Sequence, residues 1–230
     1  RGRDQEEQGD VKRGSIHLAL VILLAACRTS PAPVAPVAVR PGLEMLMVDS
    51  ANLVRGPRVA IVTNQASIDR SGIQAVDRLL RDGVNLTAIM SPEHGFRGTA
   101  APGEHVSSSR DSATGLPIYS LYGATLAPTP EMLADVDVIL VDLQDAGARY
   151  FTYIWTTDNT MRAAGERGIP IVVLDRPNPL GGLVQGNVLD TAYRTPVGLL
   201  AVPMRHGMTM GELARLVQAE RGLRVPLTVV

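Results

Sequence analysis

The segment SPEHGFRG (91–98) places a carboxylate, an imidazole and a guanidinium in one short stretch. It follows directly on VNLTAIM (84–90), an apolar run with the composition of a buried strand. Apolar neighbours such as Pro92 and Phe96 are expected to raise the pKa of the Glu93 carboxyl toward the range of a general acid. Glu93 is therefore the first candidate for catalysis. The alternative is a carboxylate that only accepts backbone N–H bonds within its loop.

Two further groups belong to the same segment. His94 can orient Glu93 or bind a substrate, and the alternatives are a metal ligand and a hydrogen-bonded structural histidine. Arg97 can bind a carboxylate through two parallel hydrogen bonds, as can Arg149 and Arg176 elsewhere in the chain. Each arginine alone is more often the partner of an ion pair.

Polar side chains also close the other apolar runs, at the point where each run ends. They are Asn64 and Gln65 after the run at 58–64, Asp142, Gln144 and Asp145 after the run at 136–143, and Asp175, Arg176 and Asn178 after the run at 169–175. Ligands of open α/β sheets bind beyond the carboxyl ends of the strands. We therefore expect these residues to converge with Glu93 at one edge of a sheet.

A second catalytic carboxylate is sought among Asp142, Asp145 and Asp175. The alternative for these aspartates is helix capping, or ion pairing with Arg149 or Arg176. The pattern does not decide between the two roles.

Aromatic residues and a histidine complete the candidate set. Tyr150, Tyr153 and Trp155 lead a predicted helix, and one of them can stack on a sugar, although core packing explains Trp155 as well. His206 lies just before a capping box, near a helix N-terminus, which suits an anion or a neutral imidazole. A structural role explains His206 equally.

The elements that must position these residues alternate along the chain. Strands are predicted at 58–64, 84–90, 116–123, 136–143, 169–175 and 225–230, and helices at 73–83, 129–136, 153–168 and from the capping box Thr209–Glu212 onward. Strands that are apolar throughout, with helices between them, indicate a mostly parallel sheet covered on both faces. The predicted class is α/β, doubly wound.

Composition and motifs exclude several classes of function. The net charge is −1 and aromatic residues make up 3% of the chain, so no nucleic-acid partner is expected. The chain lacks G-x-G-x-x-G, G-x-x-x-x-G-K-[ST] and G-x-S-x-G, and we expect no cofactor. The candidate metal ligands are Glu93, His94, Asp142, Asp175 and His206, but none has a tight ligand spacing, so a metal site is the weaker alternative.

Residues 1–27 have features that predict an export signal. Lys12 and Arg13 precede the apolar run IHLALVILLAA, which is shorter than the roughly 20 residues of a membrane-spanning helix. The run ends at Cys27 in LAAC, which resembles the bacterial lipobox. We expect residues 1–27 to be a mis-called start plus a lipoprotein signal, 28–41 a Pro/Ala-rich tether and 42–230 the catalytic domain. The protein would then be exported and lipid-anchored at the cell envelope through Cys27, and simple secretion is the alternative.

Six motifs in order carry a resemblance to a known family. They are IVTNQAS, SPEHGFRG, GLPIYSLYG, PTPEMLADVDVILVDLQDAGARYFTYIWT, VLDRPNPLGG and VPMRHGMTMGELA. The series resembles that of the bacterial exo-β-N-acetylmuramidases of the NamZ type, over about residues 42–230. The resemblance implies a Rossmann-like domain, a smaller C-terminal domain largely missing from this chain, and a cleft between the two.

The activity that the resemblance implies is a glycoside hydrolase. It would release terminal N-acetylmuramic acid from the non-reducing end of peptidoglycan fragments during cell-wall turnover and recycling. Glu93 matches the catalytic acid of the family, with His94 beside it, although Ser91 stands where the family often has glycine. The implied substrate-binding residues are Asn64, Gln65, Arg97, Asp142, Gln144, Asp145, Arg149, Tyr150, Asp175, Arg176, Asn178 and His206.

This implication agrees with the chemistry of the residues. Glycoside hydrolysis normally needs an acid at the leaving oxygen and a second group that stabilises or attacks the sugar. The lactyl carboxylate of muramic acid would use an arginine. Two alternatives stay open, namely a non-catalytic lipoprotein that binds muropeptides and a metal-dependent hydrolase.

Overall fold

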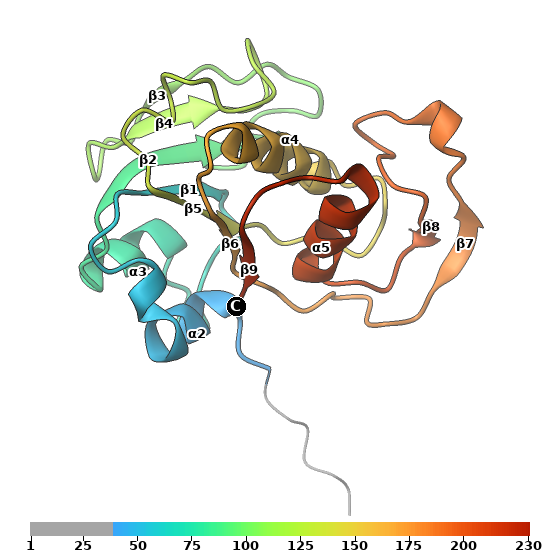
Figure 1. The fold of residues 1–230 in the computed structure, drawn as a ribbon, viewed down its shortest axis with the longest axis horizontal. Helices are drawn as coiled ribbons and strands as arrows, with labels where there is room; N and C mark the ends of the chain where they lie inside the picture. The colour runs from blue at the N-terminus through green and yellow to red at the C-terminus, as the bar shows by residue number, and fades with distance from the viewer. Residues whose placement is uncertain (1–38) are drawn as a thin grey trace, which may run out of the picture. The chain divides into compact units, whose positions relative to one another are not determined.

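The predicted strands all belong to one sheet in the computed structural model, which describes residues 39–230 (Figure 1). The sheet has seven strands in the order β3-β4-β2-β1-β5-β6-β9. Its strands are β1 (Val59–Thr63), β2 (Leu86–Ser91), β3 (Ser109–Arg110), β4 (Pro117–Ser120), β5 (Val138–Asp142), β6 (Ile171–Val173) and β9 (Leu227–Val229). Only β3, which pairs with β4, runs antiparallel to its neighbour in this sheet.

Every residue of the central strands β1 and β5 is buried. Burial of consecutive residues requires cover on both faces, because successive side chains point to opposite sides of a sheet. On one face Ile61 and Leu140 pack with α2 (Gly42–Asp49) and α3 (Ala75–Arg81). On the other face Val62 and Val141 pack with α4 (Tyr153–Glu166) and α5 (Met210–Arg221). Figure 1 shows the two pairs of helices on opposite sides. The prediction of a doubly wound α/β fold is confirmed.

The N-terminus of α5 is fixed by two sets of bonds. The predicted capping box is present, with Thr209 and Glu212 each bonded to the backbone of the other. Asp175, two residues after β6, adds its own carboxylate: Oδ1 accepts from Gly211 N at 2.8 Å and Oδ2 from Thr209 Oγ1 at 2.7 Å. Residue 211 must be glycine, because a Cβ there would lie 2.8 Å from Asp175 Oδ2. Asp175 therefore attaches α5 to the end of the sheet.

The prediction of a helix at 129–136 is wrong. The segment forms turns, in which Thr129 Oγ1 accepts from Met132 N at 3.4 Å. Arg58 binds Asp135 and Asp137 just before β5, with 2.8 Å between nitrogen and oxygen in each pair. A single turn of helix is unfavourable by itself, and these ion pairs hold the chain in the approach to β5 instead.

Between β6 and α5 the chain leaves the sheet. This segment contains β7 (Gln185–Val188), the 3₁₀ turn η2 (Thr191–Tyr193) and β8 (Pro203–Arg205), and a second 3₁₀ turn, η1 (Ala51–Leu53), follows α2. β7 and β8 pair antiparallel in a ribbon that lies beyond α5 in Figure 1. The sequence patterns did not predict the ribbon, because most of its residues are exposed and show no apolar periodicity.

No helix within residues 39–230 combines the length and apolar character needed to cross a bilayer. The predicted signal at 1–27, the lipidation of Cys27 and most of the tether at 28–41 lie outside the described residues.

Candidate active site

The carboxyl ends of the central strands meet at one edge of the sheet, as expected. Thr63 at the end of β1 is paired in register with Asp142 at the end of β5, and Glu93 follows β2 by two residues. Tyr153, the first residue of α4, is close to two of the candidate carboxylates. Burial raises the pKa of the Tyr153 phenol, and the charges of Glu93 and Asp145 raise it further. Glu93, Asp145 and Tyr153 therefore belong to one site.

The Glu93 carboxylate is buried and accepts two hydrogen bonds. Its Oε2 accepts from the hydroxyl of Thr152 at 2.7 Å, and its Oε1 accepts from the backbone N–H of Gly103 at 3.0 Å. Thr152 directly precedes α4, whereas Gly103 belongs to the exposed loop after the SPEHGFRG segment. Neither donor was predicted from the sequence. The sequence suggested apolar neighbours for Glu93, whereas the structure gives its carboxylate two hydrogen-bond donors.

The expectation of a raised pKa for Glu93 is wrong. Burial raises the pKa, but the bonds from Thr152 and Gly103 and the charge of His94 outweigh it, and the nearby phenol of Tyr122 also favours the carboxylate. The net effect lowers the pKa of Glu93 below its usual value. These contacts therefore favour the carboxylate form of Glu93, and a group that acts as an acid must gain its proton when a bound sugar changes these contacts.

His94 has an unusual backbone for its residue type. Its φ is 71°, and it is the one non-glycine residue with a positive φ within residues 39–230. Such a conformation is rarely adopted by side chains with a Cβ and is typical of functional sites. The ring Nδ1 lies 2.9 Å from the carbonyl oxygen of Ala100, which can only accept, so Nδ1 carries a proton. His94 thereby ties the loop that carries Gly103 to the Glu93 segment.

Gln65 and Arg97 lie beside the same segment. The exposed Gln65 side chain covers Gly98, where a Cβ would collide with the Gln65 amide. Arg97 is exposed, lies over the Phe96 ring at 4.6 Å and binds Asp111, with 2.6 Å between Nη2 and Oδ1. The guanidinium of Arg97 thus already has a carboxylate partner.

Asp142 and Arg176 form a buried ion pair with each other. The distances are 2.5 Å from Nε to Oδ1 and 3.0 Å from Nη2 to Oδ2, and a third nitrogen donates to the Ile68 carbonyl. Asp142 is fully buried, and its burial raises the pKa of its carboxyl while the guanidinium opposes that rise. Asp142 and Arg176 were each predicted to bind substrate. In the structure the two carboxylate oxygens of Asp142 accept hydrogen bonds from Arg176.

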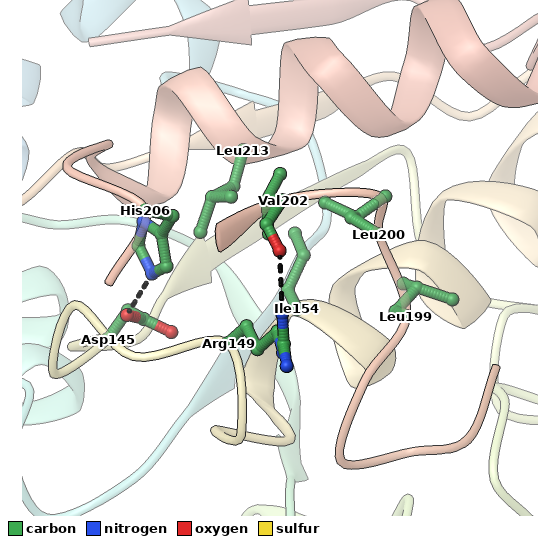
Figure 2. Close-up of a pocket in the computed structure, with 8 residues that line it drawn as sticks. All are labelled: Asp145, Arg149, Ile154, Leu199, Leu200, Val202, His206 and Leu213. Carbon is green, nitrogen blue, oxygen red and sulfur yellow. Dashed lines mark hydrogen bonds and ion pairs between the residues drawn. The ribbon is translucent and has the colours of Figure 1, made fainter. Parts of the chain in front are cut away.

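Asp145 and His206 form a second buried pair, drawn in Figure 2. His206 Nε2 lies 3.1 Å from Asp145 Oδ1, which also accepts from Gly147 N at 2.6 Å. His206 Nδ1 accepts from Met208 N at 3.1 Å, so the ring proton belongs on Nε2 and the imidazole is neutral. Among the described residues no hydrogen bond uses Asp145 Oδ2, whereas both oxygens of Asp142 and of Asp175 are occupied.

Arg149 lies beside this pair and has no carboxylate within 4.0 Å among the described residues. Its Nη1 donates to the carbonyl oxygens of Asn187 at 2.5 Å and Val202 at 3.0 Å, and the guanidinium lies 5.5 Å from the half-exposed ring of Tyr150. Of the three arginines predicted to read a carboxylate, Arg149 is thus the one that keeps its charge uncompensated. Figure 2 shows the small pocket that it shares with Asp145, Ile154, Leu199, Leu200, Val202, His206 and Leu213.

The remaining candidates hold loops together. Gln144 Nε2 donates to the carbonyl oxygens of Asp145 at 2.7 Å and Pro177 at 3.1 Å. Asn178 Nδ2 donates to the Met208 carbonyl at 2.9 Å. Asn64, at the end of β1, is fully buried, its Oδ1 accepts from Ala66 N, and its side chain lies near the Tyr153 phenol.

Three residues near Glu93 were missed by the sequence interpretation, namely Thr152, Tyr122 and Gly103. A threonine before a helix normally caps that helix, so the position of Thr152 in the sequence gave no signal of a bond to Glu93. Within residues 39–230 no group of three or more His, Cys, Asp or Glu side chains is placed to hold a metal ion.

Comparison with known proteins gives consistent matches. Residues 59–230 match the family described as exo-β-N-acetylmuramidase NamZ, N-terminal. The peptidoglycan β-N-acetylmuramidase NamZ of Bacillus subtilis (strain 168) is 46% identical over 194 residues, which are 84% of this chain and 47% of that protein. The chain thus spans about half the length of the curated relative it matches.

Two crystal structures of DUF1343 family proteins from Bacteroides fragilis NCTC 9343 share the fold, each with a TM-score of 0.73. One is 42% identical, with 83% of this chain and 48% of that chain covered, and the other is 37% identical, with 84% and 52% covered. The family match covers most of the chain and contains the strands, the Glu93 segment and the Asp145–His206 pair. The chain therefore belongs to the exo-β-N-acetylmuramidase NamZ family.

Proposed function

We propose that the full-length protein is an exo-acting glycoside hydrolase that releases terminal N-acetylmuramic acid from the non-reducing end of peptidoglycan fragments, in cell-wall turnover and recycling. The observation that carries the proposal is the buried Glu93, held by two donors at the carboxyl edge of the sheet in a member of this family. The named activity of the Bacillus subtilis relative supports the same substrate class.

In this proposal Glu93 donates a proton to the glycosidic oxygen as the bond from that oxygen to C1 of the sugar breaks. A water molecule forms the new bond to C1 and gives up one proton, which balances the one that Glu93 donated. The positive charge that develops at the sugar needs a second group. Asp145 supports this role better than Asp142 or Asp175, because its Oδ2 has no hydrogen bond from the described residues. The neutral His206 and the N–H of Gly147 fix the orientation of Asp145 through Oδ1.

The first test is direct. The full-length product of the gene is incubated with the disaccharide of N-acetylmuramic acid and N-acetylglucosamine, and mass spectrometry follows the free sugars. Release of N-acetylmuramic acid supports the proposal. A folded protein that binds the disaccharide without releasing a sugar would contradict it and favour a muropeptide-binding protein.

Arg149 is expected to select the lactyl carboxylate that distinguishes muramic acid from glucosamine. Replacement of Arg149 by methionine should lower kcat/KM for a muramic acid substrate about 10- to 100-fold, since a hydrogen bond to a charged group contributes about 1.5–3 kcal/mol. The same variant should keep the wild-type kcat/KM for any residual activity on an N-acetylglucosamine substrate. Kinetics on chromogenic glycosides of N-acetylmuramic acid and of N-acetylglucosamine, run in parallel, measure the ratio of the two kcat/KM values.

Arg97→Met is the matched control, because the guanidinium of Arg97 is already bound to Asp111. It should leave the ratio of the two substrates unchanged. Equal losses on both substrates in Arg149→Met would mean that Arg149 only supports the ribbon through Asn187 and Val202.

The proposed location is the cell envelope, with the protein exported and anchored by lipid at Cys27. The apolar run that ends in LAAC supports this location. Two or more acyl chains hold a protein at a membrane where one does not. Metabolic labelling with an alkyne fatty acid should mark the wild type and not Cys27→Ala, and an unlabelled wild type would favour simple secretion.

A further inference from the structure

Thr152 occupies the N-cap position of α4 but does not cap the helix. Its φ and ψ are −81° and −5°, and its side chain makes no capping bond. In α5 the equivalent Thr209 has a φ of −79° and a ψ of 170°, and its hydroxyl accepts from Glu212 N at 3.2 Å. Thr209 thus caps α5, whereas Thr152 does not cap α4.

The hydroxyl of Thr152 binds the Glu93 carboxylate. It donates to Oε2 at 2.7 Å, and both residues are at most 9% exposed. A hydroxyl has a single proton to donate, and a bond from it to a carboxylate is among the stronger hydrogen bonds. The bond to Glu93 does not itself prevent capping, because a hydroxyl can donate and accept at once, as that of Thr209 does between Asp175 and Glu212 N. Thr152 differs from Thr209 in its helical backbone, and among the described residues its side chain makes no bond other than the one to Glu93.

The two donors to Glu93 differ in how firmly they are held. Thr152 is continuous with α4, whose residues Ile154 and Met161 are buried in the core under the sheet. Gly103 belongs to a stretch, residues 101–105, that is exposed throughout. An entering sugar can therefore replace the Gly103 N–H at Oε1, whereas the bond from Thr152 to Oε2 stays in place.

We propose that Thr152 is the positioning residue of Glu93, and that it holds Oε2 so that Oε1 is the oxygen that delivers the proton. This inference rests on the proposed function. When Glu93 is protonated, Oε2 still accepts the Thr152 proton, so the transferable proton sits on Oε1. It passes to the glycosidic oxygen as the C1–O bond breaks, and Thr152 keeps its own proton throughout.

Other titratable groups also face Glu93. They are His94 on its own segment, Tyr122 after β4 and Tyr153 at the start of α4. Burial, and then the charge of Glu93, raise the pKa of both phenols, so these remain neutral at neutral pH. Loss of Thr152 therefore changes the titration of Glu93 without adding or removing a charge.

The experiment compares three variants of the full-length protein. Thr152→Val removes the hydroxyl at nearly constant shape, and Thr152→Ser keeps it. Thr160→Val is the matched control, because the buried Thr160 hydroxyl donates only to the Thr156 carbonyl within α4. Kinetics of N-acetylmuramic acid release are recorded as a function of pH for each variant and the wild type.

Thr152→Val should lower kcat roughly 100-fold with little change in KM, since small displacements of a catalytic group have effects of this size. Its alkaline limb of kcat/KM should move to higher pH, because the lost donor favours the carboxylate. Thr152→Ser and Thr160→Val should both follow the wild type. A wild-type pH profile in Thr152→Val, or a Thr152→Ser variant as impaired as the valine variant, would overturn the proposal.

A wild type that releases no sugar would contradict the proposed function, and a second readout then decides the role of Thr152. Carboxyl carbon resonances of labelled glutamate, with Glu93 assigned by its Gln variant, give the pKa of Glu93 directly. That pKa should rise in Thr152→Val and not in Thr152→Ser. An unchanged pKa would show that Thr152 does not act on Glu93.

Discussion

Replacement of Glu93 by glutamine is expected to reduce the release of N-acetylmuramic acid by the full-length protein about 10²- to 10⁴-fold, which is the usual contribution of a general acid. The amide has nearly the same shape and can still accept from Thr152, but it cannot deliver a proton. Most of the loss should therefore appear in kcat. Mass spectrometry of the released sugar measures it over the required range.

Glu104→Gln is the matched control for this variant. Glu104 is an exposed glutamate in the same loop, where its Oε2 accepts from Ala101 N at 2.7 Å. This change should leave turnover within about twofold of the wild type, because the side chain is exposed and the amide oxygen of glutamine can still accept from Ala101 N. If Glu93→Gln retained turnover comparable to Glu104→Gln, another group would have to supply the proton.

Binding separates this proposal from its alternative. A protein that only holds muropeptides would bind the disaccharide equally with glutamate or glutamine at position 93, and would release nothing in either form. Calorimetry on Glu93→Gln should give an affinity close to that of the wild type in both cases. Turnover by the wild type is therefore the measurement that distinguishes the two functions.

The architecture was predictable because apolar runs determine it. Strands such as β1 and β5 are buried over their full length, and only a covered parallel sheet accommodates that pattern. The same logic placed Glu93 at the carboxyl edge, since a polar group directly after a buried strand has to emerge there. The ribbon of β7 and β8 carries no such pattern, because most of its residues are exposed.

The electrostatics of the site were less predictable, because they depend on partners far apart in the sequence. Pro92 and Phe96 suggested a raised pKa for Glu93, but the hydroxyl of Thr152, from the start of α4, reverses it. Asp142 and Arg176 were each plausible ligand-binding residues, and their pairing depends on the register of β5 beside β6. Neither contact leaves a periodic signal in the chain.

This Asp142–Arg176 pair should dominate the stability of the sheet edge. Arg176→Met is expected to lower the free energy of unfolding by about 3–5 kcal/mol, because it leaves a buried carboxylate without its partner. Arg70→Met is the control, since the side chain of Arg70 is 46% exposed and binds Glu44 at the surface, 3.2 Å apart. It should lose at most about 1 kcal/mol. Urea denaturation of the described domain measures both.

A double variant and a pH series separate loss of charge pairing from loss of packing. Asp142→Leu combined with Arg176→Met should recover much of the loss, because apolar residues often replace a buried pair at little expense. Burial raises the pKa of Asp142, so without Arg176 the folded state binds more protons than the unfolded chain. Its stability relative to the wild type should then improve as the pH falls toward the usual range of a carboxyl group. A deficit in Arg176→Met that is independent of pH and unchanged in the double variant would instead assign the role of Arg176 to its contact with the Ile68 carbonyl and to packing.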